Sequence, residues 1–223
     1  MTFWIIFSGI IAPAIFWIGY LYYKDRFQPE PIRNIGTTYI LGIIAAFACS
    51  KFYALLPLIG LPEDPSAIMD SNRIQFLGYS VGVTGLVEEF FKFLPFLLII
   101  VRFKAFDEKI DGIIYASTIA LGFASFENMR YLAYMEGFEL FGRAFASPLT
   151  HTIFSSIWGY TAGIARIYNK SLFKASLKGI LLAAIFHGIF NFFTTSSALR
   201  IISAVIILII WIWRIRILKK SKK

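Results

Sequence analysis

The chain is poor in charge and has one cysteine and two histidines in 223 residues. Charged side chains make up 16% of the sequence, whereas soluble domains average about 25%. The single Cys49 excludes an internal disulfide and fits no cysteine metal site. We find no internal repeat, low-complexity segment or linker. The low charge argues against an ordinary soluble domain, and we expect residues 1–223 to form a single domain.

The chain is rich in apolar residues, which make up 58% of it. A helix needs about 20 apolar residues to cross the hydrocarbon core of a bilayer, and seven stretches reach that length. They lie near 3–23, 36–61, 76–101, 112–135, 144–165, 178–198 and 201–218. Lipid permits only helices or closed barrels, and these stretches do not alternate as barrel strands do. The sequence therefore predicts an all-α, polytopic membrane bundle of about seven transmembrane helices.

Basic residues predict the orientation of this bundle, because Lys and Arg concentrate in cytoplasmic loops. With the N-terminus outside, the outside loops hold only Arg73, Arg143 and Arg200. The inside segments then hold Lys24, Arg26, Arg33, Arg102, Lys104, Lys109, Arg166, Lys170, Lys174, Lys178, Arg214, Arg216, Lys219, Lys220, Lys222 and Lys223. The C-terminus is predicted to be cytoplasmic, with its basic tail on anionic lipid. Nucleic-acid binding is disfavoured because there is no soluble basic domain.

Glu88 and Glu89 are adjacent in the middle of the third predicted span. An ionisable side chain at the bilayer centre costs roughly 2.5–3.5 kcal/mol, so intramembrane charges usually have a function. The other ionisable residues within the spans are Lys51, Lys92, Glu127, Arg130, His151 and His187. Two polar amides, Asn128 and Asn191, lie within the same spans. Several of these residues come from four different spans at similar depth, at about 1.5 Å of rise per residue. This pattern predicts a shared polar cavity between the midplane and the outer face.

Local spacing assigns neighbours within this set. Glu88 and Lys92 are four residues apart, which places them on one helix face as an ion pair. Glu89 lies about 100° around that helix, so the two carboxylates face different neighbours and can divide acid and base roles. Glu127 and Arg130 are close enough along their helix to pair, and His187 shares a face with Asn191.

These residue types support two kinds of hydrolytic chemistry. A carboxylate can act as general base on water, a histidine can orient the water or protonate a leaving amine, and an amide can donate to an oxyanion. Alternatively, His151, His187 and Glu127 could hold a catalytic zinc, with another glutamate as base. No His-Glu-x-x-His helix is present, so metal ligands would come from separate helices. The sequence leaves both mechanisms open.

Several motifs together resemble the PrsW family of bacterial membrane proteases. They are Asp25-Arg26-Phe27-Gln28-Pro29-Glu30-Pro31, Glu88-Glu89-x-x-Lys92, Phe106-Asp107-Glu108-Lys109-Ile110-Asp111-Gly112-Ile113-Ile114-Tyr115 and Leu121-Gly122-Phe123-Ala124-Ser125-Phe126-Glu127-Asn128. His151 and His187-x-x-x-Asn191 complete the pattern, which covers about residues 10–195. Ala116 stands where the family often has glycine.

The resemblance implies an intramembrane endopeptidase of the bacterial cytoplasmic membrane, distantly related to the CAAX prenyl proteases. It implies a site of Glu88, Glu89, Glu127, His151, His187 and Asn191, with either no metal or a zinc ion. The implied substrate is a single-pass membrane protein such as an anti-sigma factor, cut near the outer face. Lys92 stands one position before the arginine of the prenyl proteases, which argues against a CAAX substrate. The sequence does not indicate an oligomeric state.

Two other functions use the same residues. Buried Glu, His and Lys also form proton relays in transporters, although we see no two-fold repeat of the kind many carriers show. A non-catalytic scaffold is the second alternative, and it would have no reason to keep the paired glutamates with both histidines and Asn191. The connector Leu61–Arg73, with two prolines and three acids, is either a gate to the site or a plain connector.

Overall fold

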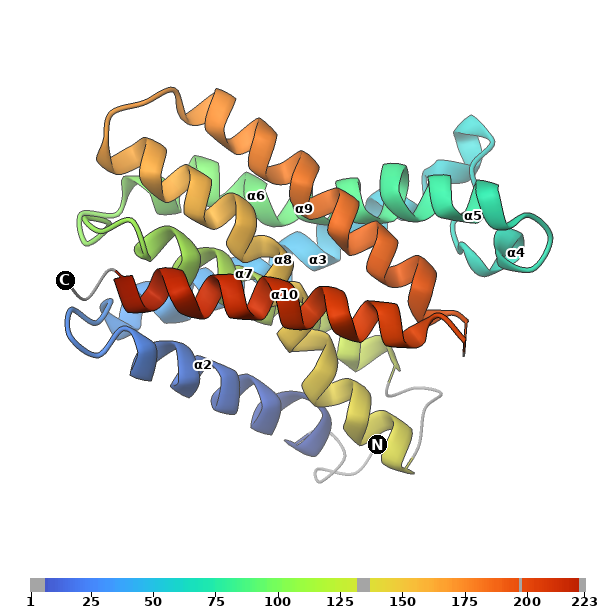
Figure 1. Ribbon diagram of the computed structural model, residues 1–223, viewed down its shortest axis with the longest axis horizontal. Coiled ribbons are helices and arrows are strands. Elements are labelled where there is room, and N and C mark those ends of the chain that lie inside the picture. Colours follow the sequence, from blue (N-terminus) through green and yellow to red (C-terminus); the bar gives the residue numbers. More distant parts are fainter. Residues whose placement is uncertain (1–6, 132–136, 197, 221–223) are drawn as a thin grey trace.

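The computed structural model describes residues 7–131, 137–196 and 198–220, and these residues form helices without strands (Figure 1). The ends of the first and fourth predicted spans, and Lys222 and Lys223 of the basic tail, lie outside the described residues. The longer helices are α2 (Ala12–Lys24), α3 (Ile32–Tyr53), α6 (Leu86–Leu98), α7 (Asp111–Tyr131), α8 (Gly137–Ile167), α9 (Leu172–Thr194) and α10 (Arg200–Lys220). Shorter segments are η1 (Phe7–Ile11), η2 (Leu56–Ile59), α4 (Ser66–Met69), α5 (Arg73–Tyr79), η3 (Ser80–Gly85) and η4 (Ile100–Arg102).

The predicted all-α fold is confirmed, and each predicted span corresponds to one long helix or helical run. The second span was placed too far along the chain, because α3 ends at Tyr53 and not near residue 61. Pro57 lies in the following short helix η2, which ends at Gly60 with φ of 78°. Proline and a left-handed glycine both break an α-helix.

Three helices are long and apolar enough to cross a membrane: Ile32–Tyr53, Leu172–Thr194 and Arg200–Leu218. Large apolar side chains are exposed on the outside of the bundle, among them Ile15, Phe173 and Ile201. Water would disfavour so much exposed apolar surface, whereas lipid favours it. The chain is therefore a membrane protein, and the number of spans stays a prediction.

Helix α7 is the centre of the bundle, and every residue from Asp111 to Ser125 is buried. Close contacts with both neighbours explain this burial. A Cβ atom on Gly122 would overlap the backbone of α3, and one on Gly159 of α8 would overlap the backbone of α7 at Gly112. Gly122, Gly159 and Gly163 therefore allow close contact between these helices.

The helical run α5–η3–α6 carries the paired glutamates and is locally unwound into a π-helix at Ser80–Gly85. Helix α9 crosses this segment at short range, because Gly85 faces the backbone of Ala184 and Gly188 faces that of Ser80. π-Helical segments occur frequently at functional sites. Here the close crossing brings His187, the neighbour of Gly188, next to the first turn of α6.

Figure 1 shows that several segments predicted to be cytoplasmic meet at one end of the bundle. The α2–α3, α6–α7 and α8–α9 connections lie at the left of that view, with the end of α10. Segments α4 and α5 lie at the opposite end. Arg214, counted above among the cytoplasmic residues, is instead buried within the bundle, where it donates to Ser117 Oγ at 3.0 Å.

Candidate active site

Four helices bring six ionisable side chains together in the interior of the bundle. Helix α6 supplies Glu88, Glu89 and Lys92, and α7, α8 and α9 supply Glu127, His151 and His187. The predicted convergence of these residues from four helices is thus present in the structure. All except Glu127 are buried, and the side chain of Glu127 is 22% exposed.

Glu89 is fully buried, and both of its carboxylate oxygens are saturated by hydrogen bonds. Oε1 accepts from Lys92 Nζ at 2.8 Å and from His187 Nδ1 at 3.0 Å. Oε2 accepts from Ser155 Oγ and Trp158 Nε1, both at 2.8 Å. A carboxylate has about four acceptor positions, so Glu89 has none left for a water molecule. Its contacts tie α6 to α8 and α9.

Glu88 differs from its neighbour because its carboxylate is poorly satisfied. Among the described residues, its Oε2 is buried without a hydrogen-bond partner. Lys92 Nζ and His187 Nε2 both lie 3.6 Å from this oxygen. Its other oxygen, Oε1, has a long contact of 3.5 Å with the hydroxyl of Tyr53. Glu88 therefore keeps the acceptor capacity that Glu89 has used.

The two histidines have different surroundings. His187 donates its Nδ1 hydrogen to Glu89, because a carboxylate can only accept, and its Nε2 then faces Glu88. Nδ1 of His151 lies 2.8 Å from Lys92 Nζ, and its Nε2 lies 2.8 Å from Glu127 Oε2. Both nitrogens of His151 are engaged, whereas Nε2 of His187 is directed toward the unsatisfied carboxylate.

Lys92 is a fully buried cation at the centre of this group. Its ammonium contacts Glu89 and His151, and it lies over the ring of Phe123 at 4.5 Å from the centroid. The spacing rule paired Lys92 with Glu88, but the closer partner is Glu89, at 2.8 Å against 3.6 Å. Residues three apart on a helix are also neighbours, and Lys92 lies closer to Glu89, the more deeply buried of the two glutamates.

The expected partner of Glu127 differs from the structure, and the role of Asn191 stays a prediction. Glu127 makes its short contact with His151, and no ion pair joins it to Arg130 within the described part of the chain. Asn191 lies one helical turn beyond His187, half-buried, and its side chain forms no hydrogen bond with the described residues. The structure thus assembles five of the six predicted site residues and leaves Asn191 at their margin.

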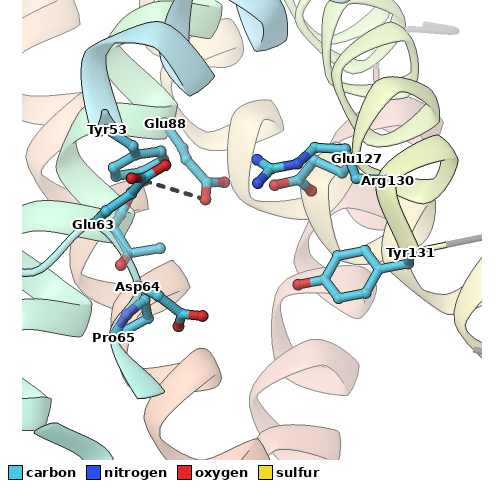
Figure 2. Close-up of a pocket in the computed structure, with 9 residues that line it drawn as sticks. Tyr53, Glu63, Asp64, Pro65, Glu88, Glu127, Arg130 and Tyr131 are labelled. Carbon is cyan, nitrogen blue, oxygen red and sulfur yellow. Dashed lines mark hydrogen bonds between the residues drawn. The ribbon is translucent and has the colours of Figure 1, made fainter. Parts of the chain in front are cut away.

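A cavity of about 470 Å³ opens beside Glu88 (Figure 2). It does not reach Glu89. Figure 2 shows Glu88 and Glu127 directed into the space, with the acidic connector on one side and the end of α7 on the other. The lining residues are Tyr53, Glu63, Asp64, Pro65, Thr84, Glu88, Glu127, Arg130 and Tyr131. The cavity is thus polar, and Glu88 is the member of the glutamate pair that it exposes.

Three residues could also hold a metal ion by type and distance. One ligand atom each of Glu88, His151 and His187 lies within 4.8 Å of the others. The sequence argument placed Glu127 in this set, and the structure has Glu88 in its place with Glu127 behind His151. These residues therefore form a group that could bind a metal.

The sequence argument missed Ser155 and Trp158, which hold Glu89, and Tyr53, which contacts Glu88. A signal existed for the first two. Ser155 and Trp158 lie four and seven residues after His151, so they share its helix face. Tyr53 lies at the end of a different helix, and no local pattern marks it.

Comparison with known proteins identifies the family of the chain. The model of a family described as "PrsW family intramembrane metalloprotease" matches residues 30–214. "Protease PrsW" of Oceanobacillus iheyensis is 33% identical over 220 residues, covering 98% of this chain and 96% of the relative. "Protease PrsW" of Clostridioides difficile is 29% identical over 224 residues, covering 97% and 90%. For the Bacillus subtilis protein the identity is 28% over 192 residues, covering 86% and 83%.

No solved structure matches the chain. The family match spans most of the sequence and includes every helix that contributes to the glutamate and histidine group. The chain is a peptidase and belongs to the PrsW family of intramembrane proteases.

Proposed function

We propose that this peptidase hydrolyses a peptide bond of a membrane-anchored regulatory protein, of the anti-sigma-factor type, near the outer face of the bacterial cytoplasmic membrane. One observation carries the proposed chemistry. Glu88 Oε2 has no hydrogen-bond partner among the described residues and lies beside a polar cavity, while Glu89 is saturated. A buried carboxylate left in this state is suited to accept a proton from a bound water.

Glu88 acts as the general base in this proposal. It takes a proton from a water as the water oxygen bonds to the carbonyl carbon of the scissile peptide. His187 Nε2 faces the same carboxylate and orients the water, because the Nδ1 hydrogen of this histidine is held by Glu89. The proton then passes from Glu88 to the leaving nitrogen as the carbon–nitrogen bond breaks.

The remaining site residues position the two histidines or stabilise the oxyanion. Glu89 and Lys92 fix His187 and His151 through short contacts, so we assign them positioning roles. Glu127 holds His151 from the far side. The Tyr53 hydroxyl in the cavity wall, and the Asn191 amide one turn beyond His187, are the proposed donors to the oxyanion.

The family is described as one of metalloproteases, and the side chains of the site can be compared with the ligands that a metal ion needs. Glu88, His151 and His187 offer the ligand types and separations that zinc takes. Nδ1 of His151 lies 3.9 Å from Glu88 Oε2, but it also lies 2.8 Å from the Lys92 ammonium. An imidazole nitrogen has one lone pair, so a metal and Lys92 would compete for it. Lys92 would have to leave His151 before a metal could bind this nitrogen, and we propose hydrolysis by glutamate and histidine alone.

The same cavity supports the proposed position of the site in the membrane. Its walls include Glu63 and Asp64 of the connector and Arg130 and Tyr131 at the end of α7. In Figure 1, α4, which lies within this connector, is at the end opposite the predicted cytoplasmic connections, and this supports a multi-pass chain whose site opens outward. A single-pass substrate entering from lipid would meet Glu88 near the outer face. The alternative functions, a proton-coupled transporter or a scaffold, have no such observation in their favour.

The test compares new protein N-termini in membranes of cells that make the wild type or Glu88→Gln, by N-terminal mass spectrometry. Termini within or beside membrane spans that arise only with the wild type would support the proposal and identify substrates. Identical termini in both, at equal expression and under several envelope stresses, would overturn it. Proton flux in liposomes without proteolysis would favour the transporter.

A further inference from the structure

A second group of acids, two of them buried and one half-buried, lies at the other end of the bundle, where the α2–α3 and α6–α7 connections meet. Asp25, Glu108 and Asp111 each offer a carboxylate oxygen, and these oxygens lie within 4.8 Å of one another. Asp25 and Asp111 are 3% and 1% exposed. All three residues belong to sequence motifs that the proteolytic site does not use.

The backbone arranges this group from both connections. Asp111, the first residue of α7, accepts from the backbone amides of Asp107 and Glu108 through Oδ2. Asp25 accepts from the amide of Glu30 through its own Oδ2, at 3.1 Å. Each carboxylate is therefore oriented by main-chain contacts of its own connection, and the two connections bring them face to face.

One oxygen of this group lacks a partner. Asp25 Oδ1 is buried and makes no hydrogen bond with the described residues. A buried carboxylate oxygen without a hydrogen bond costs free energy. Such an oxygen is therefore expected to bind a ligand from outside the chain. Its carboxylate faces those of Glu108 and Asp111, so such a ligand would sit among three acids.

No basic side chain compensates this charge. Within the described residues, no Lys or Arg nitrogen lies within 4.0 Å of the three carboxylates, and all such pairs belong to the proteolytic site. Nearby Lys109 instead lies against the ring of Tyr168, and Lys24 against that of Tyr20. Burial, together with the charges of Asp111 and Glu108, raises the pKa of Asp25 to about 7. The group therefore lacks a positive partner.

From this geometry we propose that Asp25, Glu108 and Asp111 bind a hard divalent cation of the Ca²⁺ or Mg²⁺ class. Such cations take oxygen ligands, and the site offers oxygens and no nitrogen or sulfur. Oxygens bound to one Ca²⁺ at about 2.4 Å lie at most about 4.8 Å apart, which is the limit these atoms meet. The cation would hold the start of α7 to the end of α2.

This site is separate from the proteolytic centre in both chemistry and place. The Glu88 group contains two histidines and lies beside the cavity at the opposite end of α7 from Asp111. A cation at Asp25 would fix the helix that also carries Glu127, so its binding would stabilise the bundle without contacting substrate. The proposal does not depend on the proteolytic mechanism.

The test uses the full-length protein, purified in detergent and freed of metal with chelators. Binding of radioactive Ca²⁺ is measured at equilibrium, with Mg²⁺ as competitor, for the wild type and for Asp25→Asn and Glu108→Gln. Asp70→Asn removes an exposed acid at the other end of the molecule and is the matched control. His151→Ala separates this site from the histidine group. Circular dichroism and gel filtration establish that each variant is folded.

The expected result is one cation per chain in the wild type, Asp70→Asn and His151→Ala. Asp25→Asn and Glu108→Gln are each expected to weaken binding at least about tenfold, because each removes a charged ligand. If Asp25→Asn does not fold, Glu108→Gln carries the comparison. The proposal is overturned if the wild type binds neither cation up to about 10 mM, beyond the weakest class of such sites, or if His151→Ala abolishes binding. It is likewise overturned if folded variants at Asp25 and Glu108 keep the wild-type affinity.

Discussion

The ammonium of Lys92 lies 2.8 Å from Nδ1 of His151, the nitrogen of this histidine that lies 3.9 Å from Glu88 Oε2. Lys92 is fully buried, and its ammonium also lies 2.8 Å from Oε1 of Glu89. A cation supplied by the chain itself therefore occupies one of the nitrogens of the Glu88, His151 and His187 group. The consequence can be measured.

Proteolysis by the wild type is expected to survive removal of metal. We expect the purified enzyme to keep its activity on an identified substrate after prolonged treatment with EDTA and 1,10-phenanthroline, because Lys92 supplies the central positive charge. The cation proposed at Asp25 requires that activity be measured at a temperature well below unfolding, with helicity followed in parallel. Loss of activity in a folded enzyme, restored by zinc alone, would mean that Lys92 leaves His151 for a metal.

Replacing Lys92 itself is expected to damage folding as well as activity. Among the described residues, Lys92 is the one Lys or Arg in contact with Glu89, so Lys92→Met leaves that carboxylate buried without a lysine or arginine partner. Breaking a buried ion pair in this way typically costs about 3–5 kcal/mol. Thermal unfolding in detergent measures the effect, and Lys51→Met, which removes an exposed lysine of α3, is the control. Unchanged stability of Lys92→Met would show that Glu89 is not held as an ion.

The two glutamates are expected to differ when each is changed to glutamine. Glu88→Gln removes the proposed base, so kcat should fall by about 10²–10⁴-fold with little change in thermal stability. Glu89→Gln directs an amide NH₂ group at donors such as Lys92 and Trp158, so it should lower stability as well. Unfolding curves and single-turnover cleavage separate the two effects. A fully active Glu88→Gln enzyme would refute the assignment of the base.

The sequence was sufficient to predict the helices and the convergence of Glu88, Glu89, His151 and His187, because intramembrane charge is rare and its depth can be counted. It could not divide the roles of the two glutamates. That division depends on Ser155 and Trp158, which reach Glu89 from another helix, and on how α9 is rotated. Likewise, the end of α3 depends on turn geometry near Gly60, which an apolar count does not detect.

The partner of Glu127 is a second feature that the sequence alone could not predict. Spacing along α7 favoured Arg130 as its partner, whereas the structure gives it His151 of α8. A helical wheel contains only neighbours on the same helix, and α7 is packed closely against α8 through Gly112 and Gly159. Contacts between helices therefore override contacts along one helix, and only the three-dimensional packing reveals them.

The glycines of the α9 crossing are expected to control activity without touching substrate. In Gly188→Ala the new Cβ would overlap the backbone of Ser80, so α9 must move away from η3 and take His187 with it. Overpacking of this kind costs about 1–3 kcal/mol, and a displacement of about 1 Å can cost about 10²-fold in rate. Gly82→Ala is the control, because a Cβ there meets no atom within 4 Å. Equal activity of the two variants would exclude a close crossing.

The acidic connector is expected to select substrates. Glu63 and Asp64 line the cavity wall opposite Arg130, and the connector is anchored by the Tyr79 hydroxyl, which donates to the carbonyl of Pro62 at 2.6 Å. A substrate with a lysine or arginine beside the scissile bond would place it against these acids. The double variant Glu63→Gln/Asp64→Asn should then lower kcat/KM for such a substrate.

The expected loss in kcat/KM of the double variant is modest, because Glu63 and Asp64 are exposed. Each exposed ion pair contributes about 0.2–1 kcal/mol, so the double variant should lose about 2- to 30-fold on the basic substrate and little on a neutral one. Raising the salt concentration should reduce the wild-type preference in the same direction. Asp70→Asn removes an exposed acid of the same connector that does not line the cavity, and it should leave the preference unchanged. An equal loss on both substrates would instead mean that the connector acts as a gate, opening the site to every substrate alike.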